Sequence, residues 1–136
     1  MRYLLDTNAC IRYLNGQSDN IRRMLNKLLY GQVALCSVVR AELLYGALKS
    51  RRPTQNTERL AHFLKGFPCL PFDETASDVY AKIRLQLEIE GKPVGPNDLL
   101  IAATALANGL VLVTHNTKEF GRIEGLLLKD WEAPTA

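Results

Sequence analysis

The stretch MRYLLDTN, residues 1–8, contains the feature that decides the fold, a short apolar run that ends on an acid, Asp6. Such a run is typical of a buried strand in a parallel sheet. The carboxylate cannot join the core, because burying an unpaired charge costs several kcal/mol or shifts the pKa of the group. In open α/β sheets, ligands bind at the carboxyl ends of the strands. Asp6 is therefore a candidate ligand, although it could equally cap a helix that begins near Asn8.

On the C-terminal side of this stretch, short apolar segments alternate with helical patterns along the rest of the chain. The pattern predicts strands at residues 3–5, 33–36, 69–72, 110–114 and 126–129. It predicts helices at residues 8–15, 19–30, 38–49, 56–65, 75–90 and 98–108. We expect Ser37 and Asp73 to cap two of these helices, and Gly109 to end the last one. Because parallel neighbours require crossover connections, the alternation predicts an α/β fold with a doubly wound parallel sheet.

Two more acids stand in apolar surroundings, Glu42 in SVVRAELLYG (37–46) and Asp98 in GPNDLLIAA (95–103). Glu42 could be an ordinary solvated residue on a helix, but its apolar neighbours leave it little polar face. Asp98 could be a first-turn acid that interacts favourably with the helix dipole. We favour a joint interpretation, because helix starts after other strands converge near the end of the first strand.

Three carboxylates in one pocket repel one another and require a cation to remain ionised together. No His or Cys accompanies Asp6, Glu42 or Asp98 in the sequence, and an all-oxygen site selects a hard cation, Mg²⁺ or Mn²⁺. Such a site binds phosphate oxygens and activates a water molecule. The three acids are therefore predicted metal ligands.

The stretch VLVTHNTKEF, residues 111–120, ends a strand and adds polar side chains that would face the same pocket. Asn116 could ligate metal through its amide oxygen or hold a coordinated water, or it could be a turn residue. Glu119 is a further acid, for which a helix start is the simpler interpretation. His115 could act as a base, but a lone loop histidine is more often simply exposed.

Bulk composition is that of one soluble globular domain spanning residues 1–136, with 47% hydrophobic and 23% charged residues. No apolar stretch reaches the roughly 20 residues that span a bilayer, and the N-terminal residues do not resemble a signal peptide. The three cysteines form no C-x-x-C pair, which favours a reducing cytoplasm. If three acids share a pocket, 11 of the 14 acidic residues remain against 17 basic ones, which suits an anionic partner.

The motifs LLDTN, VVRAELLYG, PNDLLIAA and VTHNTKEF occur here in that order. In motif order and in length the chain closely resembles the PIN-domain ribonucleases, specifically the VapC toxins of type II toxin–antitoxin pairs. The resemblance implies a Rossmann-like α/β/α sandwich with a mainly parallel sheet. It also implies an endoribonuclease dependent on Mg²⁺ or Mn²⁺, active on tRNA or another structured RNA, homodimeric and inhibited by a VapB antitoxin.

Residue by residue, Asp6, Glu42 and Asp98 match the family's three acidic positions, and Asn116 falls where many PIN domains have a fourth acid. A neutral amide there puts a full second metal site in doubt. Residues 40, 49–52, 92, 118 and 122 supply cations that could bind RNA near the pocket. For an antitoxin, the apolar faces around Ile11, Tyr13, Leu14 and residues 43–48 are candidate contacts, although core packing explains them equally well.

Three rival interpretations remain. A haloacid-dehalogenase phosphatase requires a second Asp two residues after the first, where this chain has Asn8, and a receiver domain requires paired N-terminal acids. A PIN-like domain that binds RNA or protein without cutting is the more serious rival. The three acids argue against it, whereas Asn116 leaves it some room.

Overall fold

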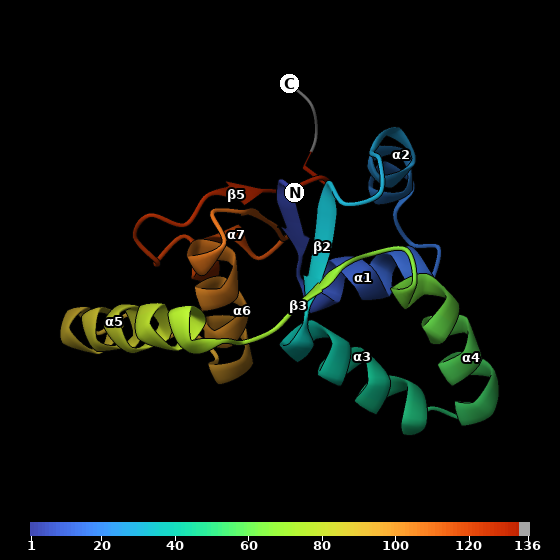
Figure 1. Cartoon of the computed structure of the whole chain (residues 1–136), viewed down its shortest axis with the longest axis horizontal. Helices are drawn as coiled ribbons and strands as arrows, with labels where there is room; N and C mark the ends of the chain where they lie inside the picture. The colour runs from blue at the N-terminus through green and yellow to red at the C-terminus, as the bar shows by residue number, and fades with distance from the viewer. Residues whose placement is uncertain (134–136) are drawn as a thin grey trace.

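The computed structural model describes residues 1–133 as a parallel sheet with helices on both sides (Figure 1). The strands are β1 (Tyr3–Leu5), β2 (Val33–Cys36), β3 (Cys69–Leu70), β4 (Val111–Val113) and β5 (Leu128–Lys129). The helices are α1 (Thr7–Leu14), α2 (Asp19–Lys27), α3 (Ser37–Leu48), α4 (Pro53–Leu64), α5 (Glu74–Glu90), α6 (Pro96–Ala107) and α7 (Thr117–Phe120). This arrangement confirms the predicted α/β fold with a central parallel sheet.

The strand order is β3-β2-β1-β4-β5, and every neighbouring pair is parallel. β1 is therefore the middle strand, with Leu4 paired to Ala34 of β2 on one side and to Leu112 of β4 on the other. Each of these three residues is fully buried. Because parallel strands share one carboxyl edge, the residues that follow β1, β2 and β4 meet at the same edge of the sheet.

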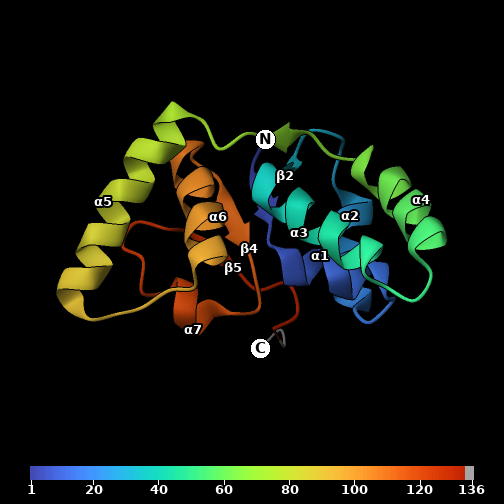
Figure 2. The ribbon, with the colours of Figure 1, turned by 90° about the horizontal axis from the view of Figure 1, so that it is seen from below.

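The helices lie on either side of the strands, with α1 and α3 nearer the middle of the molecule (Figure 2). α5 and α6 pack together toward one end, and α2 and α4 lie toward the other, with the strands between them. α6 is the most deeply buried helix, since Ile101, Ala102, Ala103 and Ala105 are inaccessible to solvent. Its apolar sequence predicted this burial, and its first turn carries Asp98 to the carboxyl edge of the sheet.

Of the three residues predicted to begin or end helices, Asp73 and Gly109 are confirmed and Ser37 is not. Asp73 caps α5 by accepting a 2.9 Å hydrogen bond from the backbone N–H of Ala76. Gly109, with φ of 65°, follows the end of α6 in the left-handed conformation that favours glycine. The prediction that Ser37 caps α3 is wrong, because the helix begins directly at Ser37 and its N-cap is Cys36. The Ser37 hydroxyl instead donates to the carbonyl of Leu70 on β3.

Other differences concern the bounds of elements. The helix start expected at Glu119 is α7, which begins at Thr117, while β3, β4 and β5 are shorter than predicted. α2 ends at Lys27 rather than near residue 30, and α4 begins at Pro53 rather than near residue 56. Proline at the first helical position explains the earlier start, because its fixed φ suits a helix and its missing N–H would lack a partner there anyway. Within residues 1–133, no helix is long and apolar enough to cross a membrane.

Candidate active site

Asp6 lies at the carboxyl end of β1 and is only 4% exposed. Its backbone N–H donates to the carbonyl of Val113 on β4, which continues the pairing of the two strands for one more residue. Its Oδ1 accepts a 2.8 Å hydrogen bond from the N–H of Ala9 and so caps α1. Capping and a place at the sheet edge are thus compatible roles for this one side chain.

Burial is the main reason that the pKa of Asp6 is raised above its ordinary value. Hydrogen bonds with Thr114 and Ala9 favour the charged form, whereas the nearby charges of Glu132 and Glu42 oppose it. A carboxylate in these surroundings gains free energy from a neighbouring cation.

Glu42 is held in place by two donors from different helices. Oε1 accepts a 2.5 Å hydrogen bond from the hydroxyl of Thr7 on α1, and Oε2 accepts one of 3.3 Å from the amide of Asn97 on α6. The side chain therefore joins three helices at the sheet edge instead of pointing into solvent. Neither Thr7 nor Asn97 was singled out from the sequence, because their contacts with Glu42 span 35 and 55 residues.

Asp98 occupies the first turn of α6, and burial raises its pKa to about 6. The charges of Glu119, Asp6 and Glu42 add to this effect, in that order. The first-turn position alone would lower the pKa of an acid through the helix dipole. Burial and repulsion therefore outweigh the dipole, which distinguishes Asp98 from an ordinary first-turn acid.

Asp6, Glu42 and Asp98 line one open groove of about 770 Å³, here called the acid groove. Side chains from the starts of α1, α3 and α6 form its walls: Thr7, Asn8, Ile11, Ser37, Val38, Ala41, Tyr45, Asn97 and Leu100. Among residues 1–133, the oxygen atoms of the three acids do not all lie within 4.8 Å of one another. The structure thus brings the three predicted ligands to one groove, and two of its donors bind Glu42.

Asn116 and Glu119 lie beside this groove rather than in its lining. The Asn116 amide nitrogen donates to Oε2 of Glu119, and Oε1 of Glu119 accepts a 2.7 Å hydrogen bond from the N–H of Gly95. A Cβ added to Gly95 would lie 3.6 Å from Glu119 Oε1 and 3.7 Å from Asp98 Oδ2. Glu119 and Asp98 therefore flank the same glycine.

Glu119 is the residue near the site that sequence reasoning undervalued. The hydrogen bond from Gly95 is the main reason that its pKa is lowered. α6 has no side-chain cap of its own, and Glu119 supplies an acceptor at its start from 24 residues away. The sequence signal is the GPND segment, which lacks a capping side chain at the start of α6. Its backbone N–H groups therefore need an acceptor, but the local sequence does not identify it.

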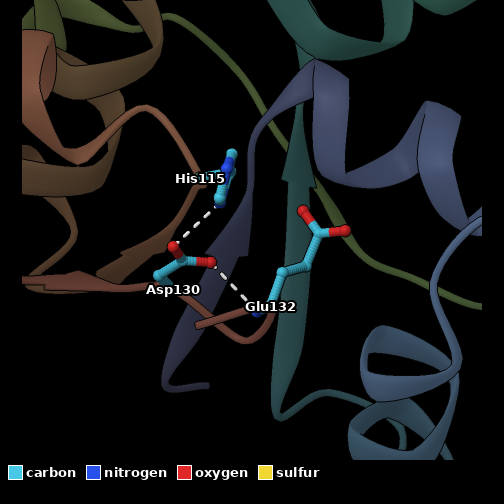
Figure 3. A group of neighbouring side chains, drawn as sticks. All are labelled: His115, Asp130 and Glu132. Atoms are coloured by element: carbon cyan, nitrogen blue, oxygen red, sulfur yellow. Dashed lines mark hydrogen bonds and ion pairs between the residues drawn. The ribbon is translucent and has the colours of Figure 1, made fainter. Parts of the chain in front are cut away.

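A second acidic group, here called the His115 group, lies at the ends of β4 and β5 (Figure 3). It consists of His115, Asp130 and Glu132, whose ligand atoms all lie within 4.8 Å of one another and could hold a metal ion. Several of its polar atoms already have protein partners. His115 Nδ1 lies 2.9 Å from Asp130 Oδ2, the N–H of Glu132 donates to Asp130 Oδ1, and Arg12 forms a salt bridge with Glu132.

Together, the parallel sheet and the acids at its carboxyl edge define an α/β protein with a candidate metal site for phosphate-ester chemistry. The chain belongs to the PIN-domain family, whose model matches residues 3–126. Within that family its relatives are VapC proteins, which confirms the resemblance drawn from the motifs.

The chain is 38% identical over 131 residues to the tRNA(fMet)-specific endonuclease VapC of Shigella flexneri, covering 96% of this chain and 98% of that protein. It is 40% identical over 133 residues to ribonuclease VapC2 of Rickettsia felis, covering 97% and 99%.

Solved structures agree with these relatives. The DNA-bound VapBC structure from Salmonella typhimurium matches with a TM-score of 0.92 at 37% identity, covering 96% of this chain and 98% of that one. VapBC2 of Rickettsia felis, bound to a promoter DNA fragment, matches with a TM-score of 0.87 at 39% identity, covering 96% and 99%.

Proposed function

We propose that the protein is a metal-dependent endoribonuclease and the toxin of a type II toxin–antitoxin pair, with residues 1–136 forming a single PIN domain in the cytoplasm. The observation that carries this proposal is the acid groove. Three carboxylates from α1, α3 and α6 or their N-caps line it, and the salt bridges among residues 1–133 include none to Asp6, Glu42 or Asp98. Burial and mutual repulsion raise the pKa of Asp6 and Asp98, as expected of ligands without their cation.

The donors fit a hard divalent cation, because they are carboxylate oxygens with amide oxygens nearby. Asp6, Asp98 and Glu42 would hold Mg²⁺ or Mn²⁺, and the bound ion would supply the charge that activates water and neutralises phosphate. Asp6 is fixed by the Ala9 N–H, and Glu42 by Thr7 and Asn97. A carboxylate so oriented can accept a hydrogen bond from the attacking water and direct it in line with the scissile bond. We further propose that Asn116 supports the site by holding Glu119 against the start of α6.

RNA is the substrate that we propose, and structured RNA such as tRNA in particular. Support comes from the relatives, because the Shigella flexneri protein is named a tRNA(fMet)-specific endonuclease and the Rickettsia felis protein a ribonuclease. Initiator tRNA is accordingly the first substrate to test. The excess of basic residues outside the groove supports an anionic substrate of this kind.

A VapB-type antitoxin is the partner that we propose, together with a second copy of this chain, since the structural neighbours are VapBC complexes. A groove of about 280 Å³ lies between α1, α3 and α4 and is mainly apolar. Its lining includes Ile11, Leu14, Leu43, Ala47 and Leu60. Tyr13, which we also considered, packs on Phe63 and lies outside this lining.

Glu42 lines both the apolar groove and the acid groove. An antitoxin segment that filled the apolar groove would therefore reach the catalytic acids directly. A basic side chain on that segment would neutralise Glu42 and exclude the metal.

Cleavage of a total RNA pool tests the proposal. Purified, antitoxin-free protein is incubated with Mg²⁺, with EDTA, and as the Asp6→Asn variant, which retains a capping side chain. The expected result is a few discrete products that require Mg²⁺ and the acid. Products that persist in the folded variant would indicate a contaminating nuclease. Absence of cleavage by folded protein would favour a domain that binds without cutting.

A further inference from the structure

A polar and aromatic stripe runs along α3 away from the acids. Glu42, Tyr45 and Lys49 are spaced by three and four residues, which places them on one face of the helix. At a rise of about 1.5 Å per residue, the ring lies about one turn and the amine about two turns beyond Glu42. The stripe therefore extends from the acid groove along a single line of side chains.

Tyr45 is 65% exposed and forms part of the lining of the acid groove. Tyr3, Tyr13 and Tyr80 each pack edge-on or tilted against another aromatic ring. Among residues 1–133, Tyr45 belongs to none of the aromatic pairs. A large and mostly exposed ring thus stands at the rim of a polar groove without an aromatic partner among residues 1–133.

Lys49 lies over this ring, with its Nζ 5.3 Å from the ring centroid. A cation thus lies close to the groove, beside a ring that is 65% exposed. A stacking surface beside an ammonium group matches single-stranded nucleic acid, whose bases stack on aromatic rings and whose phosphates bind lysine. An acid groove alone would repel that backbone, so a cation beyond the acids also offsets the repulsion.

We propose that Tyr45 stacks on an unpaired RNA base next to the scissile phosphate, while Lys49 contacts the backbone one step farther along. This inference rests on the proposed function and specifies how the substrate is held. It predicts that the cleaved phosphate lies in a loop or other unpaired segment, because a paired base cannot offer its face to a side chain.

Binding measurements test the stacking directly. Asp98→Asn protein, which is expected not to cut, is titrated into a fluorescein-labelled, single-stranded 12-nucleotide RNA of mixed sequence, and anisotropy gives Kd. Adding Tyr45→Ala is expected to weaken binding by roughly tenfold, whereas Tyr45→Phe retains it. The matched control is Tyr30→Ala, since Tyr30 is 75% exposed and lies outside the acid groove.

Salt dependence separates stacking from charge. Lys49→Ala is expected to reduce the slope of log affinity against log salt by about 0.7, the value for one phosphate contact on a single strand. Tyr45→Ala should leave the slope unchanged. If it reduces the slope as Lys49→Ala does, or if Tyr45→Phe binds as weakly as Tyr45→Ala, stacking is overturned.

Two further outcomes also count against the inference. If the Asp98→Asn, Tyr45→Ala protein binds the RNA within twofold of the affinity of Asp98→Asn alone, Tyr45 does not hold RNA. If Tyr45→Ala changes the molecular mass of the protein in solution but not its affinity for RNA, the residue instead contacts a second copy of the chain.

Kinetics distinguish this inference from the proposed function. In otherwise wild-type protein, Tyr45→Ala should raise KM by roughly tenfold and change kcat little. Cleavage with an unchanged KM would refute the stacking alone. Tyr45-dependent binding without any cleavage would refute the nuclease and leave the stacking in place.

Discussion

The carboxyl edge of the sheet carries two groups of acids, and they differ in how their charges are compensated. In the His115 group, Asp130 is held by His115 and by a backbone N–H, while Glu132 pairs with Arg12. In the acid groove, hydrogen bonds orient Asp6 and Glu42, but the salt bridges of residues 1–133 reach none of the three carboxylates. Close spacing of ligand atoms alone would have selected the His115 group.

We infer from this comparison that uncompensated charge, rather than close spacing of ligand atoms, marks the acid groove as the proposed metal site. An ion added to the His115 group must displace partners that Asp130 and Glu132 already have, so the group gains less from binding it. A group whose pKa values are raised by burial and repulsion gains the free energy that these effects cost. The acid groove is therefore where metal binding should change both activity and stability.

The largest contrast is expected in catalysis. Asp98→Asn should reduce the rate of RNA cleavage by at least about 100-fold, since a metal ligand contributes several kcal/mol to the transition state. Asp130→Asn, the matched change in the His115 group, should leave the rate within a few-fold of wild type. Initial rates with Mg²⁺ provide the measurement, and the opposite ranking would move the active site to the His115 group.

Metal binding should also stabilise the protein in a pH-dependent way. Burial raises the pKa of Asp98 to about 6, so the metal-free protein loses stability as the pH rises from about 4 through 6. At pH 7, Mg²⁺ at tenfold its Kd should add about 1.4 kcal/mol, and at pH 5 it should add less because protons compete. Thermal unfolding with Mg²⁺ and with EDTA measures both effects. An equal Mg²⁺ effect in Asp98→Asn would place the ion elsewhere.

The two roles of Asp6 can be separated by two substitutions. Both Asp6→Asn and Asp6→Ala should abolish cleavage, because each removes the negative charge. Only Asp6→Ala should also lose the cap on α1, at a cost of about 1 kcal/mol relative to Asp6→Asn. Urea unfolding of the two variants gives the difference. Equal stabilities would show that the hydrogen bond to Ala9 contributes little.

The smallest effect is expected from Glu132→Gln, which breaks the pair with Arg12. Because the Arg12 side chain is 44% exposed, the loss should not exceed about 1 kcal/mol in the free energy of unfolding. Cleavage should continue at nearly the wild-type rate. A large loss of activity in a folded variant would mean that the charge of Glu132 acts on nearby Asp6.

Most of the fold could be predicted from local patterns. The five strands and the six longer helices of residues 1–133 fall where the alternation of apolar runs and helical periods places them. Failures occurred where an element is short or a side chain has a choice of partners. For α7 only a helix start at Glu119 was expected, because its four residues are too few to show a helical period. The Ser37 hydroxyl binds a neighbouring strand instead of capping its own helix.

The candidate site could be predicted where a charged residue stands in an apolar segment. Asp6 interrupts a strand, and Glu42 and Asp98 interrupt apolar helices. Glu119 shows no such contrast, since an acid in the first turn of a helix is ordinary. Its contact with Gly95 depends on α6 and α7 meeting in space, so the neighbouring residues in the sequence could not predict it.

By itself the sequence determined the period of each element and the acids that could not be buried without a partner, because both follow from local spacing and the cost of desolvating charge. Only the tertiary structure decided that Thr7 and Asn97 hold Glu42, and that Arg12 pairs with Glu132 of the His115 group. Those outcomes depend on contacts across tens of residues. The physical reason is that charge compensation is a property of neighbours in space.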